Sequence, residues 1–221
     1  MTDRARVETV LFDIDGTLID SNGAHAQSWT QALGEHGISV DVESIRRLVG
    51  MGGDKLLPLV AGVSEDSERG RALAKRKKAI FATLLPDLEP TPGARQLIAY
   101  LREQQVDVVI ATSADDRDMS QLLQRAGVDD LIPQRASKDD AERSKPDPDI
   151  VHAALARSHA SPVTSVMVGD TPYDIEAARR AGIRVFALRC GGYWTDAALQ
   201  AADHVFDDPA ALLAHWRDAA D

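Results

Sequence analysis

Two aspartates stand two positions apart directly after the first short apolar run of the chain. The run is TVLF, residues 9–12, and the aspartates are Asp13 and Asp15. Two carboxyl groups at such a spacing can serve as nucleophile and as general acid or base, or they can bind a cation. Asp-x-Asp after a strand is also common as a simple turn or helix cap. The pair therefore indicates chemistry only if other reactive groups join it.

Further reactive side chains follow later apolar runs. Thr112 and Ser113 come after VDVVIA, Asp170 and Asp174 come after SVMV, and Lys145 lies in the loop SKPDP before a helical pattern. Each has a plainer reading: a strand end for Thr112, a solvated side chain for Lys145, and a partner of the helix dipole for Asp174. Gathered carboxylates repel one another unless a positive charge joins them. Oxygen ligands alone suit Mg²⁺, with a hydroxyl and a lysine to hold phosphoryl oxygens. An aspartate free to attack phosphorus would then form an aspartyl-phosphate.

The apolar runs predict the elements that must position these residues. Residues 9–12, 106–111, 165–168 and 183–188 are short and rich in β-branched side chains, which is typical of strands buried on both faces. Helical patterns lie between them, at 93–104, 116–126, 149–158 and 174–181. This alternation predicts an α/β fold with a doubly wound, mostly parallel sheet. Ligands of such sheets bind outside the carboxyl ends of the strands, where the reactive residues stand.

One long stretch breaks the alternation. Residues 24–37, 42–49, 54–60 and 66–85 all show helical patterns, with no strand between them. About seventy residues are too many for an ordinary crossover between neighbouring strands. We therefore predict an inserted, all-helical cap domain at residues 21–89, and a sheet domain formed by residues 1–20 and 90–221.

The ordered set of motifs resembles the haloacid dehalogenase superfamily. FDIDGTLID is similar to its first motif, Thr112 after VVIA to its second, Lys145 in SKPDP to its third and VGDTPYD to its fourth. The resemblance spans residue 8 to about residue 190, and a chance match of a whole ordered set is improbable. It implies a Rossmann-like core. The helical insertion resembles a type-one cap, as in the phosphoglycolate phosphatase and β-phosphoglucomutase branch.

The resemblance also implies a role for each motif residue. Asp13 is the expected nucleophile, and Asp15 is the expected acid for the leaving oxygen and the base for water. Thr112 is expected to bind the phosphoryl group and Lys145 to neutralise its charge. The expected Mg²⁺ ligands are Asp13, Asp170 and Asp15, the last through its main-chain carbonyl. Asp174 is expected to orient Asp170 or Lys145 without binding the metal itself.

The cap is expected to choose the substrate. His25 and Trp29 lie four residues apart on one helix face, as in the phosphatase and mutase branch, although a buried structural pair is the alternative. The segment GMGGDK, residues 50–55, resembles the cap's specificity loop, with Gly52 and Lys55 as candidate anion contacts beside Ser113 of the core. An ordinary turn is the plainer reading of that segment. One residue of the basic run 75–78 could also reach a distal anionic group, although most of the run must be solvated.

Composition limits the partners. With 25 Lys plus Arg against 35 Asp plus Glu, the chain carries a net charge of −10, which disfavours nucleic acid and anionic membrane surfaces. The single cysteine, Cys190, excludes an intrachain disulfide. The first residues, MTDRARVET, include no apolar signal region, and no apolar run is long enough to cross a bilayer. We therefore expect a cytoplasmic monomer or homodimer.

These observations favour a Mg²⁺-dependent phosphatase that acts on a small phosphorylated metabolite. Asp15 is the acid that a phosphate ester needs, and the dehalogenases that named the superfamily lack it. A sugar phosphomutase is the alternative enzyme. The residue before Asp170 is Gly169, where the mutases carry an acidic residue, and the cap loop offers Lys55 in place of the mutases' arginine; both departures favour hydrolysis. A catalytically silent phosphometabolite-binding module is the third hypothesis, but it would need neither Asp13 nor Asp15.

Overall fold

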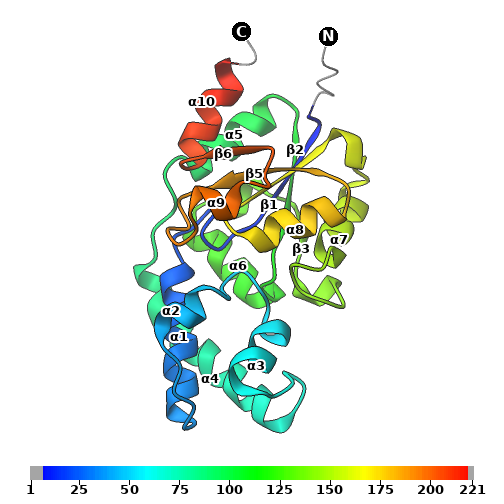
Figure 1. Ribbon diagram of the computed structural model, residues 1–221. Coiled ribbons are helices and arrows are strands. Elements are labelled where there is room, and N and C mark those ends of the chain that lie inside the picture. Colours follow the sequence, from blue (N-terminus) through cyan, green and yellow to red (C-terminus); the bar gives the residue numbers. More distant parts are fainter. Residues whose placement is uncertain (1–6, 219–221) are drawn as a thin grey trace.

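The computed structural model describes residues 7–218 and contains one six-stranded sheet, in which every pair of neighbouring strands is parallel. The strand order is β3-β2-β1-β4-β5-β6 (Figure 1). The strands are β1 (Thr9–Phe12), β2 (Asp107–Ala111), β3 (Gln134–Ala136), β4 (Ser165–Gly169), β5 (Arg184–Leu188) and β6 (His204–Phe206). The central four correspond to the four predicted apolar runs, so the predicted parallel sheet is confirmed.

Helices cover both faces of the sheet. Side chains of α5 (Ala94–Glu103), α6 (Asp116–Arg125) and α10 (Pro209–Asp218) form one hydrophobic cluster with Val10 and Phe12 of β1. Side chains of α7 (Asp149–Ser158), α8 (Pro172–Arg180) and α9 (Asp196–Leu199) form the other, with Leu11 of the same strand. Because successive side chains of a strand point to opposite faces, β1 serves both clusters and needs an uninterrupted apolar sequence. The fold is therefore doubly wound, as predicted.

The segment between β1 and α5 forms four helices of its own. They are α1 (Asn22–Glu35), α2 (Val42–Arg46), α3 (Gly53–Ala61) and α4 (Glu68–Leu84). Trp29, Leu33, Ile45, Leu56 and Leu73 belong to a third hydrophobic cluster that is separate from the two clusters of the sheet. The helices lie together at the carboxyl ends of the strands, with α10 at the opposite end of the molecule (Figure 1). We call this segment the cap, and the sheet with its helices the core.

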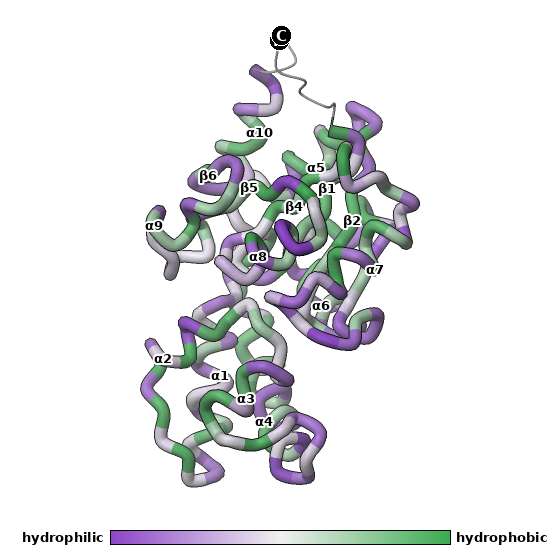
Figure 2. Tube along the Cα trace, turned by 45° about the vertical axis from the view of Figure 1, so that its right-hand side comes forward, coloured by the Kyte–Doolittle hydropathy of each residue, from purple (hydrophilic) through white to green (hydrophobic). Residues whose placement is uncertain are grey.

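Two strands and two helices appear that the sequence patterns did not predict. They are β3, β6, α9 and α10, together with short 3-10 turns at Leu85–Asp87, Asp129–Leu131, Lys138–Asp140 and Pro162–Thr164. β3 and β6 are the edge strands and have three residues each, most of them partly exposed, so neither requires an apolar run. The central strands β1 and β2 are among the most hydrophobic parts of the chain (Figure 2). Hydropathy therefore predicts the centre of the sheet and misses its edges.

Candidate active site

Neighbouring strands deliver the motif residues to one edge of the sheet. The Asp13 N–H donates to Val168 O at 2.9 Å, and the Thr112 N–H donates to Ala136 O at 3.2 Å. The sheet hydrogen bonding thus continues one residue beyond β1 and β2 and fixes where these two side chains begin. Asp170 directly follows β4, which pairs with β1. The predicted gathering of residues at the carboxyl edge is found in the structure.

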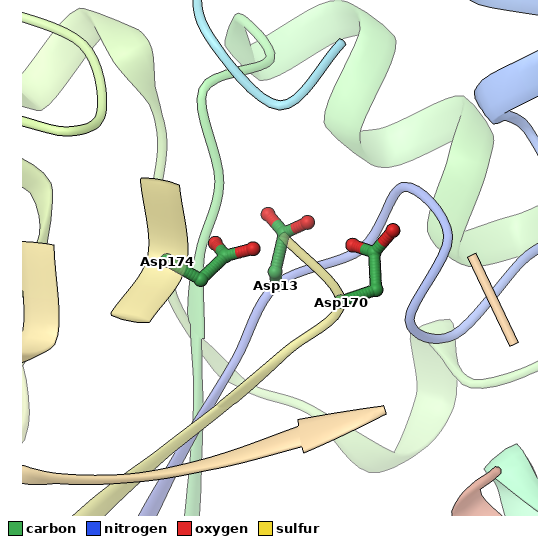
Figure 3. Close-up of side chains that lie close together, drawn as sticks. All are labelled: Asp13, Asp170 and Asp174. Carbon is green, nitrogen blue, oxygen red and sulfur yellow. The ribbon is translucent and has the colours of Figure 1, made fainter. Parts of the chain in front are cut away.

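Three buried carboxylates and one lysine form the centre of this edge. Asp13, Asp170 and Asp174 each offer an oxygen, and these oxygens lie within 4.8 Å of one another (Figure 3). Nζ of Lys145 lies 2.6 Å from Oδ1 of Asp13 and 2.8 Å from Oδ1 of Asp174. Figure 3 shows the carboxylates in a row with Asp13 in the middle. Asp15 contributes no side-chain oxygen to this cluster, since its carboxylate faces the cap.

The charges of this cluster do not balance. Burial raises the pKa of Asp13 to about 7, with Lys145 opposing the rise and the nearby carboxylates adding to it. Burial, with Asp174 and Asp13, also raises the pKa of Asp170 well above its ordinary value. Burial opposes the charge of Lys145, but the two carboxylates that it contacts raise its pKa. Three ionised carboxylates and one ammonium would leave two negative charges out of water, which a divalent cation can offset.

The surroundings of Asp170 fit such a cation. Its carboxylate accepts hydrogen bonds from the Asn22 amide at 2.7 Å and the Thr17 hydroxyl at 3.4 Å, and both groups are neutral. Oδ1 of Asn22 is buried and has no hydrogen-bond partner. A Cβ at Gly16 would lie 2.3 Å from Oδ2 of Asp170, and one at Gly191 would lie 1.8 Å from it, so only glycine lets the backbone approach. Oxygen donors without histidine or cysteine suit Mg²⁺.

Asp15 is held by the cap rather than by the carboxylate cluster. Its Oδ1 accepts from the Ser21 hydroxyl at 2.5 Å and lies 2.8 Å from Nε2 of His25, whose Nδ1 lies 2.9 Å from Nζ of Lys77. Burial lowers the pKa of His25, and Lys77 adds to this, while the neighbouring Asp15 opposes it. Nε2 of His25 faces the carboxylate of Asp15, and Nδ1 faces the amine of Lys77. Burial alone would raise the pKa of Asp15, but these contacts lower it to about 2.

Lys77 is the residue of the basic run that turns inward. It lies on the buried face of α4, with its ammonium 4.7 Å from the Phe81 ring centroid and 5.9 Å from that of Trp29. The His25 ring stacks on Phe81 at 4.1 Å. A signal for this position exists in the sequence: Leu73, Lys77, Ile80 and Phe81 share one helix face, so the lysine interrupts an apolar stripe.

A cavity of about 120 Å³ separates the cap from the core above Asp13. Its walls include Asp13, Asp15 and Thr112 and three of the predicted substrate contacts, namely His25, Gly52 and Ser113. The Ser113 hydroxyl is buried without a hydrogen-bond partner, which suits a ligand oxygen.

The structure does not bring the fourth predicted contact, Lys55, to the cavity. Its ammonium lies 2.6 Å from Oδ2 of Asp147 in the core. The N–H of Gly52 likewise donates to the Ser144 hydroxyl at 3.1 Å rather than into the cavity. These neighbours of Lys145 give no separate signal in the sequence, because only the docked cap brings them into contact.

Known proteins with similar sequences and structures identify the family of this chain. The model for haloacid dehalogenase-like hydrolases matches residues 10–188. The chain belongs to this family. A phosphoglycolate phosphatase of Pseudomonas putida is 30% identical over 96% of this chain and 80% of its own length. A phosphorylated carbohydrates phosphatase of Thermotoga maritima is 26% identical, over 82% of this chain and 85% of its own length. A structure described as a putative β-phosphoglucomutase of Bacteroides vulgatus superposes with a TM-score of 0.86 and 22% identity, covering 97% and 89% of the two chains.

This haloacid dehalogenase-like hydrolase is therefore an enzyme of the phosphoric monoester hydrolase class, as expected from its motifs. The Bacteroides vulgatus structure shares the fold. Within residues 7–218, none of the helices combines the length and the apolar character that a bilayer crossing requires.

Proposed function

We propose that the protein is a Mg²⁺-dependent phosphatase that hydrolyses a small phosphorylated metabolite through an aspartyl-phosphate on Asp13. The observation that carries this proposal is the placement of Asp13 and Asp15 on one small cavity, with Asp13 beside Lys145 and Asp15 beside Ser21 and His25.

The first step is attack on phosphorus. A carboxylate oxygen of Asp13 forms the new P–O bond, and the bond to the leaving oxygen breaks. Lys145, 2.6 Å from Asp13, offsets negative charge as the phosphoryl group arrives. Thr112 and Ser113 line the cavity, and we assign their hydroxyl groups to binding the phosphoryl oxygens.

The second step is attack by water on the phosphorus of the aspartyl-phosphate, which breaks the bond to Asp13 and releases inorganic phosphate. Asp15, which its low pKa keeps ionised at neutral pH, takes the proton of this water. To protonate the leaving oxygen in the first step, Asp15 must gain a proton before attack, and the negative charge of a bound phosphate monoester favours that uptake.

The metal ligands proposed are Asp13, Asp170 and the main-chain carbonyl of Asp15, with Asp174 held back by its contact with Lys145. Mg²⁺ at this position would supply positive charge that draws a phosphate dianion toward the carboxylates. Asn22 and Thr17 orient Asp170 for that role through their hydrogen bonds.

The test is phosphate release from p-nitrophenyl phosphate with Mg²⁺ and with EDTA. We expect turnover in Mg²⁺ only, and a loss of at least about a thousandfold in kcat for Asp13→Asn, because this variant has no nucleophile. Full activity of Asp13→Asn, or inactivity of the folded wild type with Mg²⁺, would contradict the proposal. A panel of phosphorylated metabolites ranked by kcat/KM then identifies the substrate.

The same panel separates hydrolysis from mutase activity. Hexose 1-phosphates should yield phosphate rather than an isomer. Gly169 supports this expectation: a Cβ there would lie 2.5 Å from the Asp174 side chain, so a larger residue does not fit beside Asp174 as it is placed here. Formation of an isomer would favour the phosphomutase.

A further inference from the structure

The cap docks directly on the loop that carries Lys145. The Ser144 hydroxyl donates to Oδ1 of Asp54 at 2.5 Å, and it accepts from the Gly52 N–H at 3.1 Å. The main-chain N–H of Ser144 lies 3.3 Å from the other oxygen of Asp54. Asp54 and Gly52 stand at the first turn of α3, so the start of a cap helix holds the residue that precedes Lys145.

A second contact joins the cap to the same loop, on the other side of Lys145. The ammonium of Lys55 lies 2.6 Å from Oδ2 of Asp147. Lys145 thus lies between two residues that the cap binds. We call these contacts, between Gly52, Asp54 and Lys55 of the cap and Ser144 and Asp147 of the core, the clasp.

Glycine at position 52 makes room for the contact between α3 and Ser144. A Cβ at Gly52 would lie 2.7 Å from both Cβ and Oγ of Ser144. Real Cβ atoms do not approach other atoms so closely, so any larger residue at position 52 would push the cap away from the loop. The φ of Gly52 is −75°, which every residue type can adopt. The glycine is therefore needed for the close approach and not for its backbone conformation.

Opening of the cap would break the clasp. The cavity of about 120 Å³ lies between the cap and the core, so movement of the cap away from the core would widen the entrance for a substrate. That movement separates Ser144 from Asp54. Lys145 itself is almost fully buried and contacts Asp13 and Asp174, so small shifts of its loop change the distance from its ammonium to the nucleophile.

We propose that the clasp couples closure of the cap to the positioning of Lys145, so that the lysine is set against Asp13 only when the cap is shut. Ser144 and Asp54 are positioning residues that act through Lys145. The inference rests on the proposed function, because it assumes that Asp13 and Lys145 carry the reaction. It adds a set of contacts through which closure of the cap affects the position of Lys145, without any contact between these cap residues and the phosphoryl group.

The main test uses Ser144→Ala, which removes the hydroxyl that both donates to Asp54 and accepts from Gly52. We expect kcat for p-nitrophenyl phosphate to fall about tenfold or more, as for loss of a hydrogen bond to a charged group, with a smaller change in KM. Asp54→Asn, which keeps size and removes charge, is the second variant in case the first does not fold. Tyr193→Phe is the matched control: it removes a cap–core hydrogen bond, from Arg47 Nε to the Tyr193 hydroxyl at 2.9 Å, away from the Lys145 loop.

A direct readout follows Lys145 itself. The rate at which an acetylating reagent modifies each lysine is measured by mass spectrometry. In Ser144→Ala, modification of Lys145 should become several times faster, while that of Lys75, which is exposed on α4, should not change. Tyr193→Phe should leave both rates and kcat within about twofold of the wild type.

The outcomes separate the two proposals. Equal effects of Ser144→Ala and Tyr193→Phe on kcat or on the modification of Lys145 would show a general loosening and overturn the clasp. Unchanged kcat in a folded Ser144→Ala or Asp54→Asn would also overturn it. Inactivity of the wild type with Mg²⁺ would instead overturn the proposed function, and this inference with it.

Discussion

The ammonium of Lys145 lies 2.6 Å from Oδ1 of Asp13, although 132 positions of sequence separate the two residues. It also lies 2.8 Å from Asp174, so one positive charge serves two buried carboxylates. Both groups are almost fully withdrawn from solvent, and the pair is therefore screened little by water or salt. The energetic weight of this relationship can be tested without reference to any substrate.

Lys145→Met should destabilise the protein and reduce its activity. Removing one partner of a buried ion pair leaves the other uncompensated, which costs about 3–5 kcal/mol in the free energy of unfolding. Denaturant unfolding in EDTA at pH 8 measures this loss, and it should be smaller at pH 6, where Asp13 takes up a proton more readily. In Mg²⁺, kcat should fall at least about a hundredfold. Stability equal to that of the wild type at both pH values would be inconsistent with the pair.

Without metal, the carboxylate cluster should make the protein less stable as the pH rises. The folded pKa of Asp13 is about 7 against 3.8 in the unfolded chain, so the folded state holds more protons between these values. The contribution of this group to the free energy of unfolding therefore decreases from about pH 4 to about pH 7. Mg²⁺ competes with those protons, so it should raise Tm more at pH 8 than at pH 5.5.

Asp170→Asn is the control for this effect. The variant loses one buried negative charge, so in EDTA at pH 8 it should melt above the wild type. Its Tm should respond little to Mg²⁺. If Mg²⁺ stabilised the wild type equally at both pH values, the assignment of the cluster as the metal site would be wrong.

Lys77→Met should shift the pH dependence of the second chemical step. His25 and the Ser21 hydroxyl lower the pKa of Asp15 most, and the charge of Lys77 adds to their effect, so that the pKa is held at about 2. Without the charge of Lys77, the pKa of Asp15 should rise, so the base is lost at a higher pH. With p-nitrophenyl phosphate, whose leaving group needs no proton, the acid limb of kcat should therefore move to higher pH. Lys75→Met is the comparison, since Lys75 is exposed on the same helix, and it should leave the limb in place.

Asn22→Ala should weaken metal binding without touching the metal ligands. The Asn22 amide donates to Asp170 at 2.7 Å and to Gly191 O at 3.1 Å, so it fixes the orientation of that carboxylate. Loss of such a partner reduces metal affinity by about 10- to 100-fold. Titration of Mg²⁺ against activity and against Tm gives two independent measurements. An unchanged Mg²⁺ dependence in both would remove Asn22 from the site.

The sequence alone determined the sheet and its motif residues. Short β-branched runs can be buried on both faces only as central strands, and the order of these runs is enough to place Asp13, Thr112 and Asp170 at one edge of the sheet. The same reasoning missed β3 and β6, because edge strands of three residues carry no hydrophobic requirement. The same reasoning predicted an inserted helical cap, because seventy helical residues do not fit an ordinary crossover, and the structure has the helices α1 to α4 in this segment.

Only the tertiary structure decided what the cap residues contact. Lys77 turned out to face His25, Asn22 to hold Asp170, and Lys55 to bind Asp147 rather than the cavity. A helix has a fixed period, so sequence shows which face a residue shares, but not which distant element packs against that face. The contacts between the cap and the core depend on how the cap, with its own hydrophobic cluster, packs against the core with its two. That packing is a property of the whole chain and not of any local pattern.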